Sequence, residues 1–493
     1  MAGCAAGPNY HVPASDTPPN FAADTAATRA SYANAPKQDL AAWWHSLEDT
    51  ELNSLVERAI KSNPDLEIAL TRLQQARTYE AVIVGHAVPV VDVTAAAGRG
   101  TGSDLTRARA AQAVRSADNS AGLQHINTIA GFDALWELDL FGKFRREIEA
   151  ARYSMEAASA ARNAVITSVV ADVVRAYIDL RGFQTQIGIL RNASDVLRES
   201  LRIVNIRYER GITNELDVAL ARRELDTMQA QIAPLNAQLN AVEYTLAVLL
   251  GEYPENMVQE LSPPDLIPSL PGPVAAGEPV DLLKRRPDVQ QAERELAAAT
   301  ARIGIATAEL FPQVTLVGSI GSQGQGWGTA PSIAKHIWSF GPGAVWPLLD
   351  FGALDAMVDI ASLAAHASLV NYRRTILIAV QEVDTAFDAY NAQQDRLKNL
   401  GDAMIAAQRA VDLAKARYER GLTDFLNVVD AERQYYALQE QYAAAQVVQG
   451  EQFVRLYRSL GGGWQNYQAI PDIRRPQPAI IAAFRRTISR SAP

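Results

Sequence analysis

The stretch Arg207-Tyr208-Glu209-Arg210-Gly211-Ile212-Thr213 returns later in the chain as Arg417-Tyr418-Glu419-Arg420-Gly421-Leu422-Thr423. The two copies are 210 residues apart, and the same offset relates Trp136 to Trp346 and Phe141-Gly142 to Phe351-Gly352. Nearer the start of each copy, Pro64-Asp65 and Pro89 recur 223 residues later as Pro287-Asp288 and Pro312. The two offsets place an insertion in the first copy, between Pro89 and Trp136. The chain is therefore an internal tandem duplication with a longer loop in its first half.

A very long helix is predicted before each of these two stretches. Residues 143–210 and 353–420 contain no Pro and little Gly, and at about 1.5 Å per residue each run would be on the order of 100 Å long. Apolar residues recur in them at alternating steps of three and four, interrupted by Ser194 and by Gln393. This spacing is typical of a left-handed coiled coil. Gly211 and Gly421 are expected to reverse the chain, with Thr213 and Thr423 capping the next helix.

Shorter elements precede each long helix. A helix is expected over residues 50–86 and again over 281–310, and two strand-like runs follow each of them. In residues 129–141, apolar side chains alternate with Asp133, Glu137 and Asp139, as in a barrel strand with one lipid-facing and one wet face. The face of a soluble sandwich would give a similar alternation. Four strands cannot close a water-filled barrel, so closure requires several copies, and three would give twelve strands.

Composition excludes several classes of function. The chain has 46 Lys+Arg and 55 Asp+Glu, a formal net charge of −9 and no dense basic block, which argues against nucleic acid as a partner. Its single Cys rules out disulfides within the chain and Cys-based zinc sites. Common nucleophile, phosphate-loop and zinc-protease motifs are missing, and the six His are scattered. We therefore expect neither an enzyme nor a cofactor.

The single cysteine lies at the start of the chain. Met1-Ala2-Gly3-Cys4 reads like the end of a bacterial lipoprotein signal, which predicts an acylated Cys4 in a lipoprotein carrying palmitate or a similar chain. The basic and apolar parts of such a signal are missing, so either the start is truncated or Cys4 is a chance thiol. The chain contains no run of 18 apolar residues, so we expect no transmembrane helix, and if the protein crosses a membrane it must do so with strands.

Several motifs together resemble a known family. They are GCxxGPxY at the N-terminus, NPDL at 63–66, RRPD at 285–288, LFPxV at 310–314, LLDFG at 348–352, YERGLTDFLNVVDAERQ at 418–434 and LGGGW at 460–464. In this order they resemble the TolC-like outer-membrane factors, specifically the NodT/OprM-type efflux lipoproteins of resistance-nodulation-division (RND) pumps. The resemblance implies an α+β membrane protein: a trimeric, twelve-stranded transmembrane β-barrel with four strands per chain, continued by a long α-helical coiled-coil tunnel in the periplasm.

The resemblance also implies an organisation and partners. We expect a lipid-anchored tether at 1–47, a first repeat at 48–251, a Pro-rich equatorial linker at 252–280, a second repeat at 281–461 and a C-terminal equatorial segment at 462–493. The expected location is the bacterial outer membrane, with the protein anchored in its lipid. The implied partners are two further copies, a periplasmic adaptor (membrane fusion) protein and an inner-membrane RND transporter.

Efflux of drugs or other small solutes is the function that the resemblance implies. Two alternatives stay open at this stage. A type I protein-secretion channel shares the architecture, although Cys4 and the LGGGW ending favour small-solute efflux. A coiled-coil tether without a pore would leave the alternating aromatic strands unexplained.

Two groups of site residues follow from the resemblance. The helical tips are expected to contact the adaptor through Arg210, Gly211, Ile212, Thr213, Arg420, Gly421, Leu422 and Thr423. Leu426 and Asp430, four residues apart on one helical face, match the aperture residues of the lipoprotein branch. Asp217 matches a residue that in the family bonds the equivalent of Tyr418. The alternatives are that Asp430 is a solvated carboxylate and that Tyr418 is a coiled-coil core residue.

Overall fold

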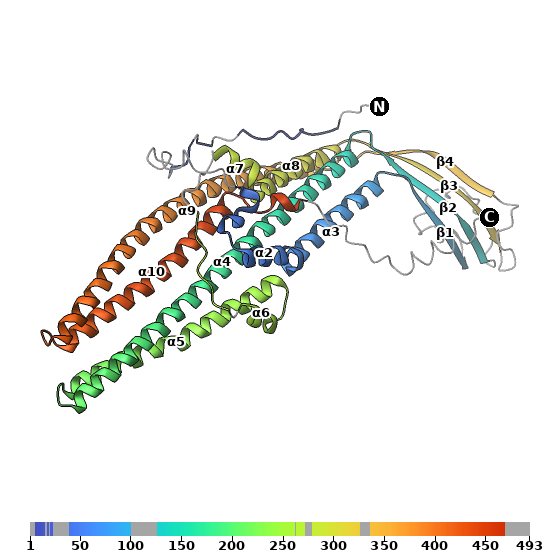
Figure 1. Ribbon diagram of the computed structural model, residues 1–493. Helices are drawn as coiled ribbons and strands as arrows, with labels where there is room; N and C mark the ends of the chain where they lie inside the picture. The colour runs from blue at the N-terminus through green and yellow to red at the C-terminus, as the bar shows by residue number, and fades with distance from the viewer. Residues whose placement is uncertain are drawn as a thin grey trace.

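The computed structural model describes residues 5–14, 17–18, 20–22, 39–99, 126–261, 263–271, 279–325 and 336–468. Two long helical hairpins extend in one direction and a four-stranded sheet extends in the other (Figure 1). The helices are η1 Leu40–Leu47, α2 Thr50–Ser62, α3 Pro64–His86, α4 Lys143–Glu209, α5 Glu215–Leu250, α6 Pro254–Leu261, α7 Pro279–Arg285, α8 Pro287–Ala308, α9 Ala353–Glu419, α10 Phe425–Ser459 and η4 Gln465–Tyr467. The strands are β1 Val90–Arg99, β2 Ile126–Leu138, β3 Gln313–Gln325 and β4 His336–Val345.

The duplication is visible in the pairing of the strands. The sheet is antiparallel with the order β1-β2-β3-β4. Val90 pairs with Leu135 in the first copy, and Gln313 pairs with Val345 in the second. The offset is thus 223 residues for the first strand of each pair and 210 for the second. The insertion therefore falls between β1 and β2, in a segment outside the described residues.

The opening helix of each copy is broken, which corrects the expectation of single helices over 50–86 and 281–310. Asn63 and Arg286 have extended backbone conformations, each directly before a Pro, because a residue that precedes Pro is disfavoured in the helical region. Asn63 caps α3 by accepting from the Asp65 amide (2.9 Å), and its side-chain amide donates to the Leu249 carbonyl (2.8 Å). The breaks thus fasten the short helices to the long ones.

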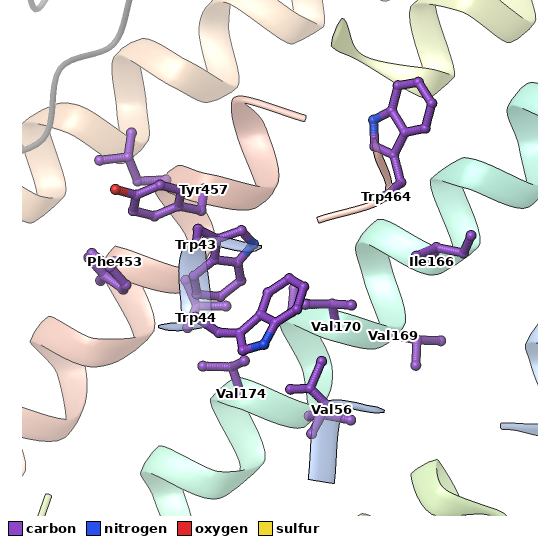
Figure 2. Close-up of a cluster of buried hydrophobic side chains, with 14 of the residues drawn as sticks. Trp43, Trp44, Val56, Ile166, Val169, Val170, Val174, Phe453, Tyr457 and Trp464 are labelled. Carbon is purple, nitrogen blue, oxygen red and sulfur yellow. The ribbon is translucent and has the colours of Figure 1, made fainter. Parts of the chain in front are cut away.

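A buried aromatic cluster lies where η1 meets the long helices. Trp43 stacks on Tyr457 of α10 with ring centroids 5.1 Å apart, and Trp44 lies beside Val170 and Val174 of α4 (Figure 2). These side chains belong to the largest core of the protein. The cluster therefore joins the N-terminal segment to both repeats midway along the molecule.

The two longest helices differ in how far one chain covers them. Both α4 and α9 contain an 18-residue window that is apolar enough to cross a membrane by length and composition alone, a test that the core helix of a soluble protein also passes. The window in α4 is 61% buried inside the protein, whereas the window in α9 is 6% buried. The apolar window of α9 is thus uncovered in a single chain, whereas residues farther along the helix, such as Val383 and Tyr390, are buried.

Candidate functional site at the helical tips

The two tips have the same backbone structure. Gly211 donates its N–H to the Tyr208 carbonyl (2.8 Å) and Ile212 donates to Arg207 (2.9 Å). The second tip repeats this pair of bonds, both at 2.9 Å, with Gly421 and Leu422 as the donors. This is the Schellman arrangement, which requires a left-handed residue after the helix.

The tip glycines are required by the backbone and not by packing. Gly211 has φ +68° and Gly421 has φ +71°, a region that is unfavourable for residues with a Cβ. A Cβ on either glycine would meet no atom of the described residues within 4 Å. The sequence-based assignment of both chain reversals to glycine is therefore confirmed.

The residues that begin the second helix of each hairpin differ from the expectation. Asn214 caps α5 by accepting from the Asp217 amide (3.1 Å), and Asp424 occupies the same position before α10 without a capping bond to the described residues. The assignment of Thr213 and Thr423 as caps was wrong by one residue. The Thr213 hydroxyl instead donates to the Asp217 carboxylate, and Thr423 accepts from the Asn427 side chain (2.8 Å).

Both tips present exposed apolar and basic groups to solvent. Ile212 and Leu422 are exposed, and so are Arg210 and Arg420. Each tip thus carries one aliphatic side chain beside one cation. This combination suits a protein surface that offers both apolar and acidic groups.

Leu426 and Asp430 lie together on α10, directly after the second tip. Phe425 and Val428 are buried, whereas the side chain of Leu426 is 55% exposed, so Leu426 points away from the hairpin core. The Asp430 carboxylate accepts from Arg433 (2.6 Å) and from the Gln434 amide (2.9 Å). Asp430 is therefore an acidic group that is partly neutralised on its own helix.

Asp217 and Tyr418 are not hydrogen-bonded to each other in the described structure. Asp217 is bonded to Thr213, and the buried Tyr418 hydroxyl has no hydrogen-bond partner among the described residues. The Arg207 guanidinium lies over the Tyr418 ring, 4.5 Å from its centroid. Burial raises the pKa of the Tyr418 hydroxyl, Arg207 lowers this pKa and Asp217 raises it. The expected direct bond is thus replaced by a cation–π contact between the two hairpins.

Sequence reasoning missed three charged residues next to this contact. Arg207 comes from α4, while Lys415 and Glu432 come from the second hairpin. Glu432 is 1% exposed and its carboxylate lies 2.7 Å from the Lys415 ammonium group. Arg207 and Lys415 also line a cleft of about 490 Å³ between α4 and the second hairpin. A charged residue in a long helix looks like part of a solvated face, so no local signal identified them.

Cys4 lies outside the described residues, but the chain directly after it is held firmly. The Ala6 amide donates to the Phe141 carbonyl (2.9 Å). The buried Arg146 side chain donates to the carbonyls of Ala6 (3.0 Å) and Gly7 (3.2 Å). This fixes the start of the described chain beside the junction of sheet and helices (Figure 1).

Comparison with known proteins places this architecture among outer-membrane channels. The model of the outer membrane efflux protein family matches residues 55–252 and 279–462. Nodulation protein T of Rhizobium leguminosarum bv. viciae is 30% identical over 500 residues, covering 100% of this chain and 96% of that protein. The pyoverdine export outer membrane protein OpmQ of Pseudomonas aeruginosa is 29% identical, covering 87% and 88%.

A solved structure agrees with these matches. The outer-membrane channel OprN has a TM-score of 0.83 and 34% identity to this chain, covering 94% of it and 100% of OprN. The expected fold, a barrel sheet continued by a helical tunnel, is confirmed, as are the outer-membrane location and the role as an exit duct for efflux. Such a duct is passive, so the chain is not an enzyme. The chain belongs to the outer membrane efflux protein family.

Proposed function

We propose that three copies of the chain assemble into a passive duct that carries drugs or other small solutes from the periplasm to the exterior. The observation that carries this proposal is the uncovered apolar face of α9, which includes Met357, Ile360, Leu363 and Leu377. An extended apolar surface of this kind marks an interface. Three chains would supply the twelve strands that a water-filled barrel requires.

The duct would be the outer-membrane component of a tripartite pump, with a periplasmic adaptor and an inner-membrane RND transporter. The full-length similarity to an export protein and to an outer-membrane channel supports this assignment. The adaptor would contact the tips at Arg210-Gly211-Ile212-Thr213 and Arg420-Gly421-Leu422-Thr423. The exposed aliphatic and basic side chains described above support this contact.

Replacement of Gly421 tests the tip contact. We expect Gly421→Val to abolish efflux while leaving an assembled protein in the membrane, since a side chain there meets open space but strains the left-handed backbone by about 1–2 kcal/mol. Resistance of cells to a pump substrate is the measurement. Gly188→Ala is the matched control, because Gly188 also has open space but lies within helix α4. Resistance retained by Gly421→Val would refute the tip assignment.

The gate would consist of Leu426 and Asp430, each repeated three times around the periplasmic opening. The outward orientation of Leu426 and its position on the same face as Asp430 support this role. Three carboxylates around a pore favour cations, although Arg433 weakens this effect in each copy. Tyr418 would hold the closed state through its contact with Arg207 of the other hairpin. Asp217 would support it from the tip of that other hairpin, where it accepts from Thr213.

We further propose that acylated Cys4 anchors the chain in the lipid of the outer membrane. The bonds of Ala6 and Arg146 support this role, because they fix the following residues at the sheet–helix junction, where a barrel leaves the membrane. Ala5 follows Cys4, and related lipoproteins that stay in the inner membrane favour Asp there. Mass spectrometry of Cys4, with the signal restored, tests the anchor, and an unmodified thiol would refute it.

The segments between and after the repeats would form an equatorial belt. In the linker proposed at 252–280, the Pro263 carbonyl accepts from Arg181 of α4 (2.9 Å) and the Pro271 carbonyl accepts from Tyr390 of α9 (3.1 Å). These bonds tie the linker to both long helices. We therefore assign the belt to 252–280, the tether at 1–47 and the segment 462–493, around the repeats 48–251 and 281–461.

Reconstitution tests the proposed function as a whole. We expect the protein to require detergent for extraction, to have the mass of a trimer, and to conduct ions in bilayers. A monodisperse water-soluble protein without conductance would support the pore-free tether instead. Export of a protein substrate in cells, with no change in resistance to small solutes, would support the type I secretion alternative.

A further inference from the structure

Among the described residues, the sheet of one chain has two open edges, on β1 and on β4. Inside the chain, the first copy of the repeat meets the second through the β2–β3 pair. In a closed ring of such repeats, β4 of one copy must meet β1 of the next copy in the same manner. This step rests on the proposed assembly of several chains into a barrel.

The two offsets of the duplication identify which residues would pair between chains. Each β2 residue corresponds to the β4 residue 210 positions later, and each β3 residue corresponds to the β1 residue 223 positions earlier. Leu135 of β2 pairs with Val317 of β3. Val345 lies 210 residues after Leu135, and Thr94 lies 223 residues before Val317. We infer that the seam between chains repeats the register of the β2–β3 pair, so that Val345 of one copy lies opposite Thr94 of the neighbouring copy.

A pair of glycines supports this register. Gly131 lies opposite Gly321 at the internal junction, and a Cβ on Gly131 would lie 2.8 Å from the Gly321 Cα. The backbones therefore approach too closely there for side chains. The corresponding residues at the seam are Gly341 and Gly98, so both counterparts are again glycine. A Cβ on Gly341 meets no described atom of its own chain within 4 Å, which leaves room for a neighbouring strand.

The junction of the strands with the long helices supports the same register independently. At the internal junction Phe141 stacks on Phe311 with centroids 4.7 Å apart. Phe351, the counterpart of Phe141, is 99% exposed and has φ +55°, which is unfavourable for a residue other than glycine. The counterpart of Phe311 is Val88, which is also exposed. The seam therefore places Phe351 of one copy against Val88 of the neighbouring copy, burying both.

Cysteine pairs test the register in the assembled protein. Because Cys4 is the only native cysteine and its sulfur is acylated in the proposed anchor, each new disulfide in the otherwise native chain is unambiguous. We expect Val345→Cys with Thr94→Cys to give covalent multimers on mild oxidation, since residues directly opposite have Cβ atoms about 5 Å apart. Val345→Cys with Asp92→Cys is the matched control, shifted by two residues on the same face, and should cross-link at least several-fold less. Phe351→Cys with Val88→Cys should also cross-link.

The outcomes separate this inference from the proposed assembly. Amine-reactive cross-linking of the same samples reports whether a trimer exists, independently of the cysteines. A trimer in which the shifted strand pair cross-links better than the in-register pair would overturn the register alone. Absence of any multimer would overturn both. Because the strand pair and the corner pair are separate sites, misfolding of one double variant leaves the other as the test.

Discussion

Helices α4 and α9 are duplicates of one another with opposite surroundings. Helix α4 contacts α3, α5, α8 and α10 within the chain, whereas α9 contacts α7, α8 and α10 and leaves its apolar window open. Tyr153 on α4 packs against Tyr10 and lies under the Arg294 guanidinium. Leu363, its counterpart on α9, is 68% exposed.

One ion pair at the start of α4 has no ionic counterpart at the start of α9. Lys143 on α4 lies 3.4 Å from Glu309, and the corresponding residues in the other junction are Ala353 and His86. Contacts that form as one chain folds can be ionic, because both partners belong to the same chain and stay close to each other. A face that must find a separate chain gains more from apolar area, which drives association without exact pairing. The difference between these two pairs fits the proposed assembly, in which α9 meets a separate chain.

A charge on the open face of α9 should have the largest effect on assembly. We expect Leu363→Asp to convert the trimer into single chains, because each copy would bury an unpaired carboxylate at a penalty of several kcal/mol. Light scattering in detergent measures the mass. Leu266→Asp is the control, since Leu266 is also exposed but lies outside the long helices. A trimer that survives Leu363→Asp would remove α9 from the interface.

Truncation of one leucine on each helix should separate effects on folding from effects on association. Leu180 of α4 is fully buried within the chain, so Leu180→Ala should destabilise folding by about 2–5 kcal/mol. Leu377 of α9 is exposed in the single chain, so Leu377→Ala should weaken association while changing the stability of the dissociated chain by less than about 0.5 kcal/mol. Denaturant unfolding and the trimer dissociation constant measure the two effects. Equal losses of folding stability would contradict the distinction.

The two hairpins should also differ in their control of conductance. We expect Leu426→Ala combined with Asp430→Ala to raise single-channel conductance by roughly tenfold, a change of about 1.4 kcal/mol in the gate, and to lower cation selectivity. Leu216 is the counterpart of Leu426 in the first copy and is exposed on α5. Leu216→Ala should leave conductance unchanged. Unchanged conductance in the double variant would exclude the gate assignment.

The smallest expected effect concerns an acidic pair present in only one of the two copies. Burial, and then Glu451, raise the pKa of Asp179 to about 6 from its ordinary value of 3.8, and the counterparts of these residues are Ala389 and Ala241. As the pH falls through 6, the folded state takes up a proton that the unfolded state does not yet bind, so stability increases until about pH 4.

Replacing this carboxyl should remove that pH dependence. We expect Asp179→Asn to stabilise the protein at pH 7.5 by roughly 1 kcal/mol, less than the full shift implies because the carboxyl is partly solvated. The gain over the parent should vanish near pH 4. Denaturant unfolding across this pH range measures it, with Asp388→Asn on the exposed side of α9 as the comparison. A constant difference at all pH values would exclude titration of Asp179.

The sequence by itself determined the elements of local and repeating structure. The duplication followed from the recurring stretch at 207–213 and 417–423, and the coiled coil followed from the alternating apolar steps. Gly211 and Gly421 identified the chain reversals because a left-handed backbone has a strong residue preference. The breaks before Pro64 and Pro287 were missed, although the restriction that Pro places on the preceding residue is local.

The tertiary structure alone decided which groups meet. Arg207 lies over Tyr418 and Glu432 is buried beside Lys415, although these residues belong to separate elements with ordinary helical sequences. A periodic pattern shows which face of a helix is apolar, but it does not specify what covers that face. That choice depends on how helices far apart in the chain pack together, and so the apolar window of α4 became largely core while the apolar window of α9 stayed open, although Val383 and Tyr390 of α9 are buried like their counterparts in α4.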